Sequence, residues 1–164
     1  MRTVRRIEPG PGQESVWDYP RPPRVEASRD RIRVRLGGRT VIDTTDSVRV
    51  LETSHPPVYY VPREAVTAEL AEAPGSSFCE FKGVARYLTI VSGGRREEAA
   101  VWYYPDPAPG YEALAGRVAV FPSRMDGCEV SGETVQPQEG DFYGGWITSK
   151  VVGPFKGAPG TAGW

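Results

Sequence analysis

The sequence predicts a mainly β protein built from antiparallel strands, with one or two short helices. The chain has 19 glycines and 16 prolines among 164 residues, more than a helical protein tolerates, because both residues break helices and favour turns. Apolar side chains also alternate along several short runs bounded by these turn residues, as in strands with one buried face. The length fits one domain.

Three segments are expected along the chain. Residues 1–24 form a proline-rich arm without an apolar period, and Trp17 and Tyr19 indicate that this arm docks, because aromatic rings bury large areas. Residues 25–137 hold the predicted strands. Residues 138–164 form a tail rich in glycine and large rings, which we expect to pack on the domain or on a second subunit.

The clearest strand runs over residues 29–36, where arginines alternate with Asp30, Ile32, Val34 and Leu36. Gly37-Gly38 supplies a tight turn, and residues 40–43 return antiparallel. A further strand is predicted over residues 47–53.

The elements in the middle and at the end of the chain are predicted from the same kinds of signal. Residues 58–61 are extended, and a short helix is predicted over 62–70, with proline in its first turn and its end before Pro74-Gly75. Strands 85–91 and 99–104 flank Ser92-Gly93-Gly94-Arg95 and form a second hairpin, and residues 127–130 and 133–136 form a third around Ser131-Gly132. Between these hairpins we expect one helical turn at 111–115 and a strand at 118–121.

Charge and hydropathy disfavour two classes of partner. Ten arginines precede position 41, yet the net charge is −1, and the arginine row over residues 29–35 is not interleaved with aromatics. This row therefore favours a solvated strand face over nucleic-acid binding. No apolar run reaches signal-peptide length or the roughly 20 residues that span a bilayer, so we expect a cytoplasmic protein without a membrane partner.

Cysteine and histidine are too sparse for a metal centre. Cys79 and Cys128 lie far apart and accompany a single histidine, so neither paired-thiol nor paired-histidine spacing occurs. We expect both thiols to be free, and we predict no metal and no cofactor.

The densest group of reactive side chains joins Glu52 and His55 to Cys79 and Lys82. His55 follows a strand and precedes proline, so it could act as a general acid or base, oriented by Glu52, provided that the strand ends by Thr53. Cys79 could be a nucleophile if Lys82 or His55 lowers its pKa. The alternatives are a turn histidine bonded to backbone and a buried, inert thiol.

Two further features could serve in ligand binding. Lys82, followed by Gly83, can reach an anion, although no glycine-rich phosphate loop surrounds it. Trp102 and Tyr104 share one strand face and could form a stacking wall for a flat ligand, while core packing explains them equally well.

Several motifs occur together and in order, covering about residues 17–130: Tyr19-Pro-Arg-Pro-Pro-Arg24-Val-Glu26, Leu51-Glu52-Thr-Ser-His55-Pro-Pro-Val-Tyr59-Tyr60-Val-Pro62, Phe78-Cys79-Glu-Phe81-Lys82-Gly83, Trp102-Tyr-Tyr104-Pro105 and Val120-Phe121-Pro122. In this combination the chain resembles the family called domain of unknown function 427, which also carries a nucleotidyltransferase-like label. The resemblance implies a β-tent-like fold, in which antiparallel sheets lean together around a groove. The label itself implies chemistry that needs metal-holding carboxylates, and the sequence has no closely spaced Asp pair in a suitable strand.

The family motifs nominate a groove site in this chain. They imply a small anionic, partly aromatic ligand, with His55, Glu52 and Cys79 for chemistry and Arg24, Tyr59, Lys82, Trp102 and Tyr104 for binding. The alternative is a noncatalytic binding or interaction module in which the same residues hold the turns together. The sequence leaves a homodimer open.

Overall fold

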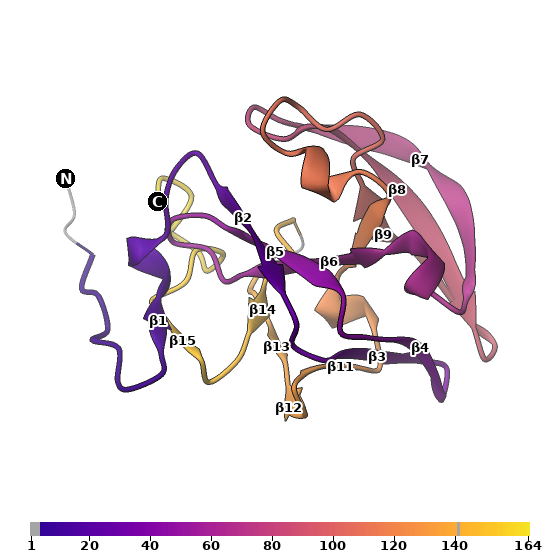
Figure 1. Ribbon diagram of the computed structural model, residues 1–164, viewed down its shortest axis with the longest axis horizontal. Helices are drawn as coiled ribbons and strands as arrows, with labels where there is room; N and C mark the ends of the chain where they lie inside the picture. Colours follow the sequence, from indigo (N-terminus) through magenta and orange to yellow (C-terminus); the bar gives the residue numbers. More distant parts are fainter. Residues whose placement is uncertain (1–3, 141) are drawn as a thin grey trace.

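The computed structural model describes residues 4–140 and 142–164, and it confirms a mainly β fold (Figure 1). Fifteen strands and four 3-10 helices follow one another, with no α-helix in the described ranges. The first three residues of the predicted arm, and residue 141 of the predicted tail, lie outside the described residues.

The larger sheet has seven strands, and within the described residues all of its neighbouring strands pair antiparallel. Its order across the sheet is β2 (Arg24–Ser28), β5 (Ser47–Leu51), β6 (Val58–Pro62), β10 (Arg117–Val120), β9 (Arg95–Tyr103), β8 (Gly83–Ser92) and β7 (Glu69–Cys79). Because side chains alternate along each strand, this sheet presents two different faces. On β6, for example, Tyr60 lies on one face while Tyr59 and Val61 lie on the other.

A smaller antiparallel sheet covers one of these faces. Its order is β12 (Glu133–Thr134), β11 (Gly127–Val130), β3 (Ile32–Leu36) and β4 (Arg39–Thr44). Ile32, Val34 and Leu36 of β3 are fully buried in one core cluster with apolar residues of β8 and β10. The opposite face of the larger sheet carries a second cluster, which includes Tyr60 and Trp102.

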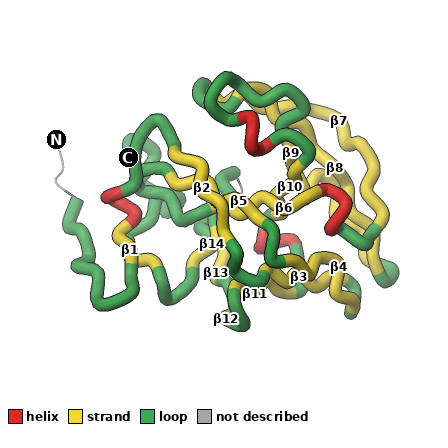
Figure 2. Tube along the Cα trace, viewed as in Figure 1, coloured by secondary structure: helices red, strands yellow, loops and turns green. Residues whose placement is uncertain are grey.

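The N-terminal arm and the C-terminal tail lie side by side. Strand β1 (Glu14–Ser15) pairs in parallel with β15 (Val151–Val152), and Figure 1 shows this pair on the same side of the molecule as the C-terminus. Strand β13 (Gln136–Pro137) pairs with β14 (Trp146–Ile147). A third core cluster joins Val16 and Tyr19 of the arm to Leu51 and Val151. Most of the N-terminal arm and most of the C-terminal tail are loop (Figure 2).

The helix predicted over residues 62–70 is wrong. The helical turns are all short: η1 (Val16–Asp18), η2 (Arg63–Ala65), η3 (Glu112–Leu114) and η4 (Pro122–Arg124). After η2 the chain turns towards β4, where Val66 bridges to Ile42 and the amide of Thr67 donates to the carbonyl of Val41. Tertiary pairing of β-branched residues thus overrides the local helical pattern.

Strand β7 was not predicted, because Pro74-Gly75 looks like a turn between elements. The structure places this dipeptide inside β7, at a register shift between Ala73 and Ser76. The strand lies at the edge of the sheet, where proline is tolerated and a bulge absorbs the extra residues. The predicted strands over 29–36 and 47–53 are shorter than expected and run over Ile32–Leu36 and Ser47–Leu51.

Within residues 4–140 and 142–164, no helix is long and apolar enough to cross a membrane.

Candidate functional site

A partly open pocket of about 260 Å³ lies on the face of the larger sheet that the smaller sheet leaves uncovered. Four parts of the chain form it: the segment from β5 to β6, the β7–β8 hairpin, β9 with the end of β10, and the tail. The lining residues that matter below are Glu52, His55, Tyr60, Phe78, Cys79, Lys82, Trp102, Tyr104, Phe121, Gln138, Phe142, Tyr143 and Lys156. The volume is just below the roughly 300–1,000 Å³ of typical small-molecule sites.

The chain between β5 and β6 brings Glu52 and His55 to the same side. Strand β5 ends at Leu51, and the amide of His55 donates to the carbonyl of Glu52 at 3.0 Å. Ser54 completes this turn with φ of +72°. Nε2 of His55 therefore lies 3.7 Å from Oε2 of Glu52, which a continuous strand would not allow.

Glu52 has a second, closer partner on the N-terminal arm. Nε of Arg21 lies 3.3 Å from Oε2 of Glu52, and Nη2 of Arg21 donates to the carbonyl of Thr53 at 2.9 Å. The carboxylate at the pocket wall is thus balanced by a guanidinium.

The imidazole of His55 is neutral near pH 7. Burial, and to a lesser extent the positive charges of Lys156, Arg21 and Lys82, together lower its pKa to about 3. Because the ring is neutral, its contact with Glu52 is not an ion pair. The amide nitrogen of Gln138 lies 3.4 Å from Nδ1, an arrangement that suits the tautomer protonated at Nε2.

This electrostatic environment predicts the pH dependence of His55. The pKa of the folded His55 ring lies below its ordinary value of 6.5, so at any pH between these two values the unfolded chain binds more protons than the folded chain. The free energy of unfolding should therefore fall as the pH drops below about 6.5, and His55→Gln should remove this part of the slope. His55 is the only histidine, so NMR reports it directly. A ring that titrates near pH 6.5 would contradict the assignment.

Aromatic rings form the floor of the pocket. Nε1 of Trp102 donates to the hydroxyl of Tyr60 at 3.1 Å, and the ring centroids of Trp102 and Phe121 are 4.5 Å apart. Tyr104 lies beside Tyr60, with the centroids 6.3 Å apart. Burial raises the pKa of both tyrosines, so both hydroxyls stay neutral.

Cys79 and Lys82 lie on the β7–β8 hairpin and also line this pocket. Nζ of Lys82 lies 5.9 Å from the centroid of the Tyr104 ring, within the range of a cation–π contact. Both cysteines are free. Cys128 belongs to the core, where burial raises the pKa of its thiol to about 12 and keeps it protonated.

Two nominated residues do not line the pocket. Arg24 is exposed on β2 and lies 3.7 Å from Glu26. Tyr59 points to the opposite face of β6, because it alternates with Tyr60, and its ring centroid lies 5.3 Å from that of Trp146. The other six nominated residues, Glu52, His55, Cys79, Lys82, Trp102 and Tyr104, all line the pocket.

The tail adds pocket residues that the sequence did not nominate: Gln138, Phe142, Tyr143 and Lys156. Tyr143 stacks edge-on against His55, with centroids 4.8 Å apart. The aromatic content of the tail indicated packing, but no local motif pointed to this pocket.

The described residues contain no group of three or more His, Cys, Asp or Glu side chains that could hold a metal ion. The pocket lining offers an imidazole, a thiol, two amino groups, two carboxyl groups and aromatic rings.

Comparison with known proteins gives a family. No curated protein matches the chain. A family model described as a domain of unknown function (DUF427) matches residues 24–131, which include both strands that flank His55 and the hairpin that carries Cys79 and Lys82. Since this match covers well over half of the sequence, the chain belongs to the DUF427 family.

Proposed function

We propose that the pocket binds a small anionic molecule with a flat, apolar part. One observation carries this proposal: Lys82 and Lys156 line an aromatic pocket, and neither is paired with an Asp or Glu side chain among the described residues. An unpaired ammonium group in a half-buried site favours an anion.

The aromatic walls support a flat ligand. Trp102, Tyr104 and Phe121 offer ring faces or edges at the floor, and Phe78 and Phe142 remain 75% and 66% exposed at the mouth. Large exposed rings around a cavity are typical of binding sites, because a ligand that covers them removes apolar surface from water. The volume fits a molecule with one or two rings.

Binding is favoured here over proton transfer. An efficient general base has a pKa near the working pH, whereas the pKa of His55 is lowered to about 3. The catalytic roles of His55, Glu52 and Cys79 stay predictions, as do the tent-like arrangement of the sheets, the cytoplasmic location and a homodimer.

A titration with naphthalene-1-sulfonate tests the proposal, since this probe joins a flat ring system to one negative charge. We expect saturable binding in isothermal calorimetry at low salt, and about tenfold or greater loss of affinity in Lys82→Met, because a hydrogen bond to a charged group contributes roughly 1.5–3 kcal/mol.

Lys150→Met is the matched control, because Lys150 contacts Asp30 and does not line this pocket. This variant should bind the probe as tightly as the wild type does. The proposal would be contradicted if Lys82→Met bound the probe as tightly as the wild type, or if the wild type showed no saturable binding.

A further inference from the structure

We infer that the acidic group of the ligand is a dianion of the phosphate monoester class, and that Lys156 of the tail selects it. This inference rests on the proposed function, whose ligand it narrows from any small anion to a doubly charged one. Lys156 lies outside residues 24–131, the part of the chain that the family model matches.

Lys156 is held in place through its main chain. Its amide donates to the carbonyl of Ser54, the residue before His55, at 2.9 Å. Its carbonyl accepts from the side-chain amide of Gln138 at 2.7 Å. Gln138 is only 4% exposed, and its side-chain oxygen Oε1 accepts a hydrogen bond from the main-chain amide of Gly145 at 3.0 Å. Lys156 is therefore a fixed part of the pocket wall.

The tail as a whole packs closely against the pocket floor. A Cβ atom on Gly144 would lie 2.7 Å from Cη2 of Trp102 and 2.9 Å from Cδ1 of Phe121, so only glycine allows this approach. The pairing of β13 with β14 and of β1 with β15 fixes the segment on either side. The tail thus packs on the same rings that the family domain supplies, and Lys156 of the tail lines the same pocket.

The ammonium group of Lys156 can donate more hydrogen bonds than it makes with the described residues. Nζ lies 5.4 Å from the centroid of the Tyr143 ring and donates to the main-chain oxygen of Trp164 at 3.2 Å. An ammonium group has three donors, so two remain. Together with Lys82, it places two positive charges in a half-buried pocket.

Two charges of one sign favour a ligand that neutralises both. A monoanion would leave one ammonium group uncompensated, which is costly in a partly desolvated site. The two acidic residues of the lining do not remove this excess, since Glu52 is paired with Arg21 and Glu80 is exposed at the mouth. Lysine ammonium groups are common partners of phosphate.

The test compares two probes with the same ring, 1-naphthyl phosphate and naphthalene-1-sulfonate, by calorimetry on the full chain at pH 8. The phosphate is a dianion there, because its second pKa is about 6. We expect the wild type to bind the phosphate about tenfold more tightly than the sulfonate, since each added charge-assisted contact has an effect of this size.

Lys156→Met should abolish this preference: phosphate affinity falls about tenfold, while sulfonate affinity changes by less than about threefold. Lys156→Arg keeps the charge and should restore most of the preference. Should Lys156→Met unfold, Lys156→Gln, which can still donate to Trp164, replaces it and should show the same loss. Lys150→Met should keep the wild-type preference.

The outcomes separate the two proposals. If the wild type binds neither probe, the proposed function fails, and this inference fails with it. If the wild type binds the sulfonate but shows no preference for the phosphate, or if the folded charge-removing variant keeps the preference, the dianion inference alone is overturned.

Discussion

Gly93→Ala should destabilise the protein by about 3 kcal/mol or more, whereas Gly94→Ala next to it should cost only about 1 to 2 kcal/mol. Both glycines have positive φ, at +55° and +80°, so both substitutions strain the backbone. Only at Gly93 does the added Cβ also meet another main chain, 1.9 Å from the carbonyl oxygen of Gly37. Around Gly94 nothing lies within 4 Å.

The reason for this difference is that two hairpin turns pack backbone against backbone. Gly37 belongs to the turn between β3 and β4 of the smaller sheet, and Gly93 to the turn between β8 and β9 of the larger sheet. The hydroxyl of Ser92 donates to the carbonyl of Leu36 at 2.8 Å and fastens the two turns together. Urea unfolding followed by circular dichroism measures both variants. Equal losses would show that the two turns do not need this close approach.

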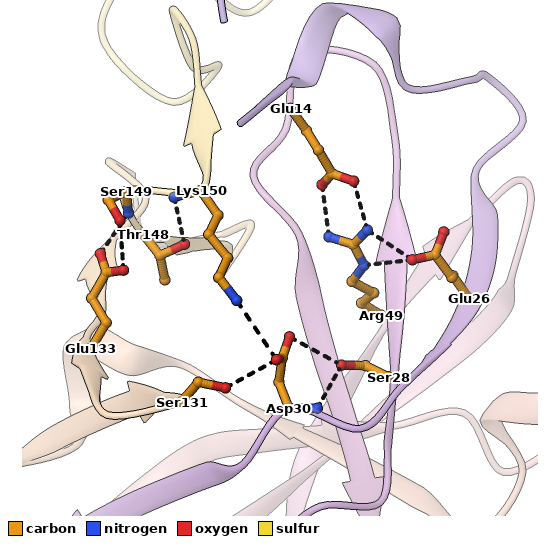
Figure 3. A network of polar contacts seen from close by, with 10 residues as sticks. All are labelled: Glu14, Glu26, Ser28, Asp30, Arg49, Ser131, Glu133, Thr148, Ser149 and Lys150. Atoms are coloured by element: carbon orange, nitrogen blue, oxygen red, sulfur yellow. Dashed lines mark hydrogen bonds and ion pairs between the residues drawn. The ribbon is translucent and has the colours of Figure 1, made fainter. Parts of the chain in front are cut away.

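Arg49→Met should cost about 2 to 3 kcal/mol, because it removes four charge-assisted hydrogen bonds and leaves Glu14 with the hydroxyl of Tyr19 and Glu26 with the exposed Arg24, 3.7 Å away. The side chain of Arg49 is 15% exposed, and its guanidinium donates to Glu14 at 2.8 and 2.9 Å and to Glu26 at 2.7 and 3.0 Å (Figure 3). Since Glu14 belongs to β1, this network ties the N-terminal arm to β5 and β2.

The matched control is Arg31→Met, because Arg31 also forms a two-bond pair, with Asp43, but its side chain is 55% exposed. An exposed pair of this kind contributes about 0.2–1 kcal/mol, so the loss should be small. If Arg31→Met lost as much unfolding free energy as Arg49→Met, burial of the side chain could not be the cause of the larger loss expected at Arg49.

The same network predicts a difference in pH dependence. Arg49 lowers the pKa of Glu14 below its ordinary value of 4.5 through hydrogen bonds that outweigh the effect of burial. A lowered carboxylate pKa stabilises the fold fully above the unfolded pKa, and this contribution is lost as the pH falls through the folded value. The difference in unfolding free energy between wild type and Arg49→Met should therefore shrink as the pH drops below about 4.5.

The sequence predicted those elements whose signals are local. Strict alternation identified β3, and paired glycines identified the hairpins at Gly37-Gly38 and Gly93-Gly94. It failed where a distant partner decides the conformation. Val66 and Thr67 have the local pattern of a helix but pair with β4, and Pro74-Gly75 becomes a bulge because β8 pairs on both sides of it.

The residues of the candidate site also fall into those that a local pattern predicted and those that it did not. A motif near a strand end brought Glu52 and His55 together, and alternation put Trp102 and Tyr104 on one face. Arg24 and Tyr59 share the motifs but point elsewhere. Gln138 reaches His55 from 83 positions away, so no local pattern could have revealed it. Only the folded chain shows that the tail completes the pocket.

The ring of His55 offers the most direct test that this pocket binds a small anion, because the chain has a single histidine and it lines the cavity. The measurement is a titration of the full chain, labelled at histidine nitrogen, with 1-naphthyl phosphate, followed by NMR. The account predicts that the ring signals shift and saturate with the affinity found by calorimetry, and that Lys82→Met weakens this response. Ring signals that stay unmoved at saturating probe would contradict it.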